Sequence, residues 1–462
     1  MTVALTHDLG RFVSNLRFSD LPKNVVDRVA VAFADSIAVT VAGAGEPAPR
    51  LLKSILASRG DEATLIGIGK RASALDAACI NGTAAHALDF DDTAQRGGHI
   101  SAVMVPAILA EAEVVGSSGQ QMVTAYAAGF EAFSDVIARD PGQHHEKGWH
   151  PTGVFGTIAA AAACASLRRL DAGQAAMAIA LSASQAGGVV ANLGTMTKPF
   201  HAGNAARNGI LSARLSEVGF TAAEDALEHA HGFLAAFSPG GAIDVETPVR
   251  AGEVWRICGD NPQSTKQYPL CHYTHRAIDG LLDLVRDTWI CADEIERITV
   301  SMSERNATIL RYHLPQTGLE AKFSIEFAVA ATIIHGQPGL AELSDKFVLR
   351  PEVQELMKRV GVRRQKHDNP ELPGYALYDQ VVIEMRDGRN IETARVSRVR
   401  GGPYLRLSRD ALWGKFRDCM SGTALLPRSG ELFDSLLAIH ELPHVTDIVR
   451  LLTDEKAAGP DT

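Results

Sequence analysis

The stretch "FSDLPKNVVDRVAVAFADSIAVTVAG", residues 18–43, decides the fold class. Its apolar residues recur at the i, i+3 and i+4 spacing that marks one face of an α-helix. Ser19 or Asp20 can cap the start of this helix, Pro22 suits its first turn, and Gly43 can end it. The stretch therefore predicts a long helix with a buried face.

The same texture continues through the first 265 residues. Further helices are predicted over residues 74–88, 101–116, 119–138 and 152–168, and another begins with Asp171 as its cap. These segments are rich in alanine and glycine, whose small side chains let helix axes approach closely. We therefore predict a compact all-helical bundle, and not a coiled coil built on large side chains.

A different texture begins at residue 266. Residues 294–304 show an alternating pattern that includes β-branched residues, which predicts a strand. Residues 378–399 contain two such alternating runs joined at Asp387-Gly388, which predicts a hairpin. The segments "KFSIEFAVAATIIHG" and "RPEVQELMKRV", which lie between them, predict helices. The sequence after residue 266 is therefore of the α+β type.

Helical texture then returns around residues 408–420, 427–439 and 444–454. The predicted fold class is mainly α, with three consecutive parts. Residues 1–265 form the first part of a helical domain, residues 266–404 form an inserted α+β domain, and residues 405–462 return to the helical domain.

Composition and charge exclude several classes of protein. The 462 residues include 54 acidic and 45 basic side chains, and the resulting net charge of −9 disfavours nonspecific binding to nucleic acid. The sequence contains no apolar run long enough to span a membrane and no secretory leader, so we expect a cytoplasmic protein. The six cysteines contain no CxxC pair, which argues against a zinc site and a disulfide framework.

Titratable residues concentrate in "AAHALDFDDTAQRGGHI", residues 84–100. Four interpretations of this segment stay open: a metal site of carboxylates and imidazoles, a phosphatase with an aspartyl nucleophile in a DxDxT motif, a structural network at a helix end, and an organic active site in which Asp89 orients a neighbouring base. The titratable residues of the segment are His86, Asp89, Asp91, Asp92, Arg96 and His99.

Three further segments carry candidate functional residues. His150 in "HPTGVFG", residues 150–156, is expected at a helix N-terminus, where a neutral imidazole is favoured, although it could simply cap that helix. Lys198 in "GTMTKPFHAGNAARNG", residues 194–209, could hold a carboxylate or could be a surface lysine. The segment "KQYPLCHYTH", residues 266–275, lies where the texture changes and could form a site or an aromatic hinge.

The motifs "NGxxAHALDFDDT…H", "GWHPTG", "GTMTKPFHAGNAARNG" and "KQYPLCHYTH" occur in this order over nearly the whole chain. Together they resemble the MmgE/PrpD family, which includes 2-methylcitrate dehydratase, cis-aconitate decarboxylase and iminodisuccinate epimerase. The resemblance implies a large helical domain built from both ends of the chain, an inserted α+β lid domain and an active site between them. It also implies a homodimer that needs neither a metal nor an organic cofactor.

The resemblance also implies site residues, position by position. His150 would be the general base or acid, with His99 opposite and Asp89 orienting one imidazole, while Lys198 and Lys266 would bind carboxylates. The other implied substrate contacts are Thr93, Tyr268, Cys271 and His275. Two positions depart from the family pattern. His145 stands where a tyrosine is frequent and could be a second base, and Phe327 replaces a tyrosine of decarboxylase-like members, which disfavours that activity.

The family's substrates are small di- and tricarboxylates, and each reaction can develop negative charge beside a carboxylate. Such chemistry needs cations, a neutral base and exclusion of water. The leading prediction is a cofactor-independent hydro-lyase of the 2-methylcitrate dehydratase type. The alternatives are an epimerase of an amino-dicarboxylate such as iminodisuccinate, a cis-aconitate decarboxylase-like lyase, and a noncatalytic dicarboxylate-binding protein.

Overall fold

The computed structural model describes residues 3–57, 60–94, 98–259, 263–366 and 368–453, so Arg96 lies outside the described residues. The protein is mainly α-helical, as predicted, with small sheets. The chain divides into two compact units, the first made of residues 1–265 and 412–462 and the second of residues 266–411. The return to the first unit thus falls at Leu412, inside a helix, whereas the change in texture placed it at residue 405.

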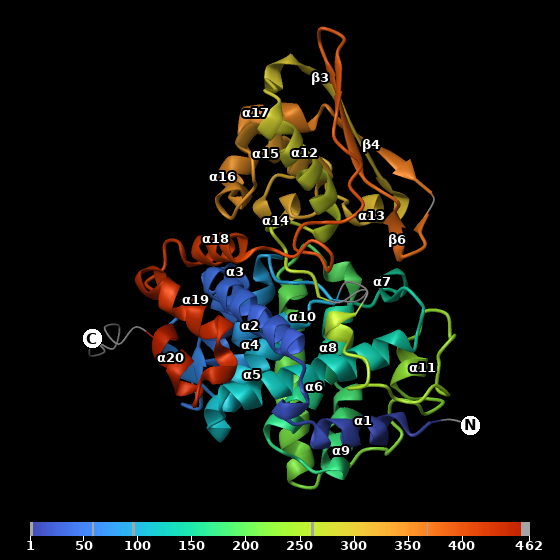
Figure 1. Cartoon of the computed structure of the whole chain (residues 1–462), viewed down its shortest axis with the longest axis vertical. Coiled ribbons are helices and arrows are strands. Elements are labelled where there is room, and N and C mark those ends of the chain that lie inside the picture. The colour runs from blue at the N-terminus through green and yellow to red at the C-terminus, as the bar shows by residue number, and fades with distance from the viewer. Residues whose placement is uncertain (1–2, 58–59, 95–97, 260–262, 367, 454–462) are drawn as a thin grey trace. The chain divides into compact units, whose positions relative to one another are not determined.

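The first unit is built mainly from helices of both ends of the chain. Its N-terminal helices are α1 (Leu5–Asn15), α2 (Lys23–Gly43), α3 (Pro47–Leu56), α4 (Ala74–Ala87), α5 (Ser101–Val115), α6 (Gly119–Ala138), α7 (His144–Lys147), α8 (Pro151–Leu167), α9 (Ala172–Ala183), α10 (Thr197–Glu217) and α11 (Phe233–Phe237). Its C-terminal helices are α18 (Arg409–Met420, from Leu412 on), α19 (Ser429–Leu437) and α20 (Thr446–Leu452). In Figure 1 the red α19 lies against the blue α2, so helices from the N-terminal and C-terminal parts of the chain pack together.

Small residues allow close helix packing at the centre of this unit, where α10 packs against both α4 and α8. A Cβ atom at Gly203 of α10 would lie 2.1 Å from the carbonyl oxygen of Cys79 in α4, and one at Gly82 of α4 would lie 2.9 Å from the Cα atom of Gly203. No side chain fits at either position. Glycine therefore brings α10 against α4, and with it the residues at the start of α10.

The structure corrects two details of the first unit. Helix α2 begins at Lys23 after Pro22, because Asp20 instead accepts a hydrogen bond from the backbone N–H of Arg17 and closes a short 3₁₀ turn. The region is also not entirely helical. Strands β1 (Ala63–Leu65) and β2 (Lys70–Ala72) form an antiparallel hairpin, too short for its alternation to be recognised in the sequence.

The second unit combines a four-stranded sheet with helices. The sheet has the order β4-β3-β7-β8, in which β4 runs parallel to β3 and the other neighbours are antiparallel. The predicted strand is β3 (Ile295–Ser303), and the predicted hairpin is β7 (Gln380–Met385) with β8 (Asn390–Glu392). The remaining strands are β4 (Val360–Gln365), β5 (Asp368–Asn369) and β6 (Leu372–Ala376). The helices are α12 (His275–Asp287), α13 (Glu304–Ile309), α14 (Gly318–Ala321), α15 (Ile325–His335), α16 (Asp345–Val348) and α17 (Pro351–Met357).

No helix among the described residues has the length and apolar character that crossing a membrane requires. All six cysteines are described, and none of them forms a disulfide in this structure.

Candidate active site

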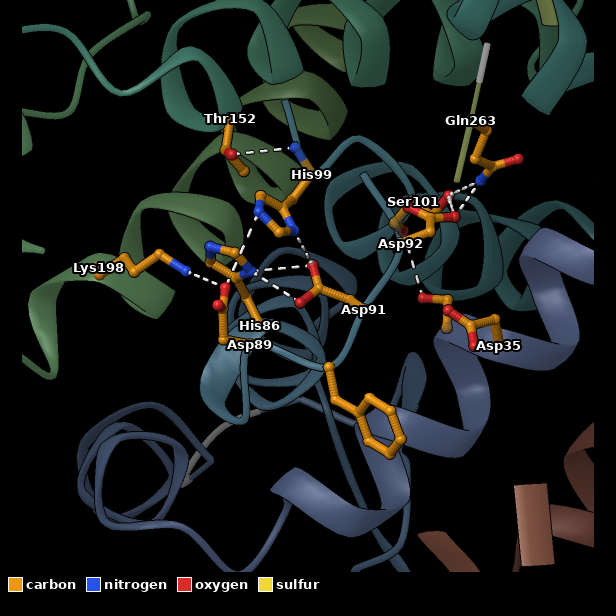
Figure 2. Close-up of polar contacts among 12 residues, drawn as sticks. Asp35, His86, Asp89, Asp91, Asp92, His99, Ser101, Thr152, Lys198 and Gln263 are labelled. Atoms are coloured by element: carbon orange, nitrogen blue, oxygen red, sulfur yellow. Dashed lines mark hydrogen bonds and ion pairs between the residues drawn. The ribbon is translucent and has the colours of Figure 1, made fainter. Parts of the chain in front are cut away.

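The candidate site lies where α4 ends. After Ala87 the chain turns through Asp89, whose φ of 52° falls in the left-handed region. A residue other than glycine keeps such a conformation at a cost and needs support from its surroundings. Figure 2 shows that the side chains of Asp89, Asp91 and Asp92 then reach different partners. We refer to residues 89–92 as the site turn.

Asp91 holds two imidazoles at once. Its carboxylate accepts a hydrogen bond from Nδ1 of His86 at 2.9 Å and another from Nδ1 of His99 at 3.0 Å. Burial alone would raise the pKa of Asp91, but the two imidazoles hold that pKa well below its usual range. Because an ionised carboxylate only accepts hydrogen bonds, both rings must carry a proton on Nδ1. His86, whose pKa burial lowers to about 3, is then a neutral ring that keeps the lone pair of a base on Nε2.

The neighbouring Asp92 has the opposite character. Burial, strengthened by the charges of Asp35 and Asp91, raises the pKa of Asp92 well above its usual range and so favours its neutral form. Its Oδ2 accepts hydrogen bonds from the Ser101 hydroxyl, at 2.5 Å, and from the Gln263 amide. The environment thus shifts the pKa values of two adjacent carboxyl groups in opposite directions.

Lys198 is a buried cation at the start of α10. Its Nζ lies 2.5 Å from Oδ1 of Asp89, and its side chain is 8% exposed. The interpretation of Lys198 as a surface lysine is therefore wrong. Nε2 of His99 lies 3.9 Å from the same oxygen of Asp89, so the cation and this imidazole share one carboxylate.

His150 is the N-cap residue of α8, as predicted, but its side chain makes no capping hydrogen bond. The interpretation of His150 as a simple helix cap is therefore wrong. Its Nδ1 instead lies 3.1 Å from Nδ1 of His201 on α10. Burial, reinforced by His86 and the charge of Lys198, lowers the pKa of His150 well below its usual range. His150 is consequently a neutral imidazole at neutral pH.

His86 connects the two sides of the histidine cluster. Its ring centroid lies 4.4 Å from that of His99 and 5.7 Å from that of His150, and it is nearly parallel to the latter at 20°. Burial lowers the pKa of His86 to about 3. The half-buried His145 is more peripheral, with its ring centroid 6.4 Å from that of His150.

The structure thus gathers five of the predicted site residues of the first unit around one point: Asp89, His99, His150, Lys198 and His145. Thr93 lies just beyond the site turn, where its backbone pairs with that of Ser264 through hydrogen bonds of 2.9 and 2.7 Å.

The remaining predicted residues lie in the second unit, at its first segment. Lys266 is buried. The Tyr268 hydroxyl donates a hydrogen bond to Asp279 at 2.7 Å, and Nε2 of His275 lies 3.2 Å from the carbonyl oxygen of Leu270. Cys271 is buried and belongs to the hydrophobic core of this unit. Tyr268 and His275 are therefore engaged within their own unit.

Sequence reasoning missed three residues of the site: His86, Asp91 and His201. His86 and Asp91 were recognised only as members of a titratable cluster, because nothing in the sequence distinguishes the aspartate that contacts imidazoles from its neighbours. For His201 a signal existed. It follows Lys198 by three positions on α10, and residues at that spacing share one face of a helix.

The structure does not support the phosphatase interpretation. The DxDxT motif of such enzymes follows a strand, but here the aspartates follow α4. Asp91 is also engaged by two imidazoles, and the Asp89 carboxylate lies against Lys198.

Four side chains at the site could in principle bind a metal ion, which leads to a prediction about metal removal. His86, Asp89, Asp91 and His99 could each offer a ligand atom, and these atoms lie within 4.8 Å of one another. However, the Lys198 ammonium already neutralises Asp89, and protons on two imidazoles satisfy Asp91. We therefore expect dialysis against a chelator to leave kcat/KM unchanged. Stoichiometric metal in the active protein, with activity lost on chelation and regained on adding the metal, would contradict this expectation.

Comparison with known proteins defines the class. The MmgE/PrpD N-terminal domain matches residues 7–246, and the MmgE/PrpD C-terminal domain matches residues 268–427. The chain therefore belongs to the MmgE/PrpD family, as its motifs predicted, and is an enzyme of this type in the lyase class.

Three curated relatives are cis-aconitate decarboxylases. The chain is 26% identical to the one from Mus musculus, over 98% of this chain and 94% of the relative. It is 28% identical to the one from Homo sapiens, over 74% of this chain and 71% of the relative. It is 25% identical to one from Aspergillus terreus, over 97% of this chain and 96% of the relative.

Proposed function

We propose that this enzyme decarboxylates cis-aconitate or a closely related unsaturated tricarboxylate. The observation that carries the proposal is the named activity of relatives that match nearly the whole chain. The leading prediction from the sequence was a 2-methylcitrate dehydratase. The relatives support the alternative of a cis-aconitate decarboxylase better.

By the family resemblance, Phe327 in place of a tyrosine disfavours decarboxylation. This residue is fully buried in the hydrophobic core of the second unit, with its ring centroid 6.3 Å from that of Phe347. A side chain in that position is explained by core packing alone. We therefore give Phe327 no weight in choosing among the family's reactions.

The geometry of the first unit suits such a reaction. The buried Lys198 ammonium, which pairs with Asp89, can bind a substrate carboxylate. Burial and the charge of Lys198 keep His150 neutral before substrate arrives. A tricarboxylate brings negative charge, which raises the pKa of nearby imidazoles and allows one of them to take up a proton.

The reaction then needs one bond cleavage and one protonation. The carboxylate on the saturated carbon of cis-aconitate leaves as CO₂, and the electron pair of the broken bond is delocalised through the double bond toward the remaining carboxylates. A protonated imidazole, from His150 or His99, delivers a proton to the far carbon of this allylic system. Lys198 stabilises the charge that develops on the carboxylate it binds. The product is an unsaturated dicarboxylate.

Incubation with cis-aconitate in D₂O tests the proposal. We expect CO₂ release together with a dicarboxylate that carries one deuterium from solvent, measured by mass spectrometry and proton NMR. An enzyme-free reaction is the control. Conversion of 2-methylcitrate to an alkene without CO₂ would establish the dehydratase instead, and deuterium exchange into iminodisuccinate without CO₂ would establish the epimerase. If the protein bound all three acids without turning any of them over, it would be a noncatalytic binding protein.

The other implications of the resemblance stay predictions. They are a homodimer, a cytoplasmic location, a bundle arrangement of the helical domain, a lid role for the second unit, and carboxylate or substrate contacts by Lys266, Thr93, Tyr268, Cys271 and His275.

A further inference from the structure

A buried lysine from the C-terminal part of the chain contacts the site turn. Lys415 on α18 donates a hydrogen bond from Nζ to the carbonyl oxygen of Phe90 at 2.7 Å. The same Nζ lies 4.1 Å from the centroid of the Phe90 ring, within the range of a cation–π interaction. Phe90 stands between Asp89 and Asp91. One ammonium therefore holds both the backbone and the ring of the central residue of the turn.

Lys415 has a buried counter-ion. Its Nζ lies 2.5 Å from Oδ1 of Asp35 on α2, and the two side chains are 4% and 1% exposed. Burying such a pair costs solvation, and apolar residues of similar size are frequently as stable in its place. Stability alone is therefore a weak reason for an ion pair at this position, which makes its contact with Phe90 the informative feature.

The neighbours of Phe90 are held by other parts of the first unit. Asp89 contacts Lys198 of α10, and Asp92 is held by Ser101 and Gln263. Asp91 contacts the two imidazoles. The left-handed conformation of Asp89 requires that the chain on both sides of it be fixed. Lys415 supplies that fixation directly after Asp89.

We propose that Lys415 is a positioning residue of the active site, which acts by holding Phe90 so that Asp89 and Asp91 keep their contacts with Lys198, His86 and His99. The C-terminal segment of the chain thereby contributes to catalysis without contacting substrate. The expected effect of Lys415 on turnover rests on the proposed function. Its structural side can be measured in the absence of any substrate.

Substitutions of the ion pair separate positioning from stability. Lys415→Met leaves Asp35 buried without its cation, so we expect a lower denaturation midpoint and a loss of about 10²-fold in kcat/KM through misplacement of the site turn. The double variant Asp35→Asn/Lys415→Met removes both charges. It should recover much of the midpoint while kcat/KM stays low, because nothing then holds Phe90. Lys415→Arg keeps a cation and should recover part of the activity.

A substrate-free measurement tests the same geometry. In protein labelled with ¹⁵N-histidine, the Nδ1 protons that His86 and His99 donate to Asp91 should exchange slowly with solvent and resonate at low field. In the double variant these signals should broaden or disappear. The matched control is Lys23→Met, which removes the exposed lysine of the Lys23–Asp27 pair on the same helix as Asp35. It should change neither the signals nor the activity.

The outcomes distinguish this proposal from the proposed function. A double variant with wild-type histidine signals and wild-type kcat/KM would overturn the positioning role and leave Lys415 as a structural ion pair. Loss of the signals in the double variant, together with no turnover of cis-aconitate by the wild-type protein, would support the positioning role and reject the substrate. If Lys415→Met alone does not fold, the double variant and Lys415→Arg still decide between these outcomes.

Discussion

Replacing Asp91 by asparagine should lower kcat/KM by about 10⁴-fold, the size of the loss in kcat when a carboxylate behind a catalytic imidazole becomes an amide. The cause is the tautomer. Nδ1 of His86 lies against both carboxylate oxygens of Asp91, at 2.9 and 3.1 Å, so an asparagine places its NH2 group, which must donate, against that ring whichever way the amide is turned. At least one ring would have to turn its lone pair toward the amide and keep its proton on Nε2. The rates can be measured with cis-aconitate over a range of pH.

Asp92→Asn is the matched control for this experiment. Asp92 is adjacent and equally buried, but its partners are Ser101 and Gln263, which both donate hydrogen bonds to its Oδ2. An amide oxygen can accept both of these, so the loss in kcat/KM should stay near the fivefold worth of one neutral hydrogen bond, about 1 kcal/mol. If Asp91→Asn kept activity within about tenfold of the wild type, the imidazoles would not depend on Asp91 for their tautomers.

Much of the fold follows from the sequence because its elements are long and strongly patterned. Helices α5, α6 and α8 begin and end within one or two residues of their predicted bounds, and Asp171 with Gln174 forms the predicted capping box of α9. The hairpin of β7 and β8 turns at Asp387-Gly388, with Gly388 at φ 87°. Strand β4 was missed, because its apolar and charged residues follow a helix with no turn signal between them.

The sequence predicts which residues belong to the site better than it predicts which of them contact one another. The types of side chain needed to bind a carboxylate and to move a proton single out His99, His150 and Lys198 in the sequence. Their partners are set by tertiary contacts. Nothing local in the sequence links Lys415 to Phe90, 325 positions apart. Nothing local distinguishes Asp91, whose pKa is lowered, from Asp92, whose pKa is raised. Both the Lys415–Phe90 contact and the different pKa shifts of the two aspartates depend on which helices pack around the site turn.

The effect of replacing Lys198 on stability is also set by a tertiary contact that the sequence does not predict. A lysine lying among small residues suggests from the sequence a group that contributes to binding and little to packing, so that its removal would barely change stability. The structure places Lys198 in a buried ion pair with Asp89. Removing one partner of such a pair leaves the other charge buried without compensation, which costs about 3–5 kcal/mol.

Lys198→Met should therefore affect both activity and stability. We expect kcat/KM to fall by about 10² to 10³-fold, because the substrate carboxylate loses its cation both on binding and as charge develops in the transition state. The free energy of unfolding should fall as well, because the Asp89 carboxylate stays buried without the ammonium. Denaturant titration measures the second effect, and turnover of cis-aconitate measures the first.

The double variant Asp89→Asn/Lys198→Met separates the two effects. It removes both buried charges, so the free energy of unfolding should recover while kcat/KM stays low. Lys147→Met is the control, since Lys147 is an exposed cation on α7, the helix that carries His145, and should change neither quantity. Calorimetric titration with the unreactive propane-1,2,3-tricarboxylate should show weaker binding to the double variant than to the wild type. Equal binding, with turnover near the wild-type rate in the refolded double variant, would mean that another cation holds the substrate and that Lys198 serves the fold alone.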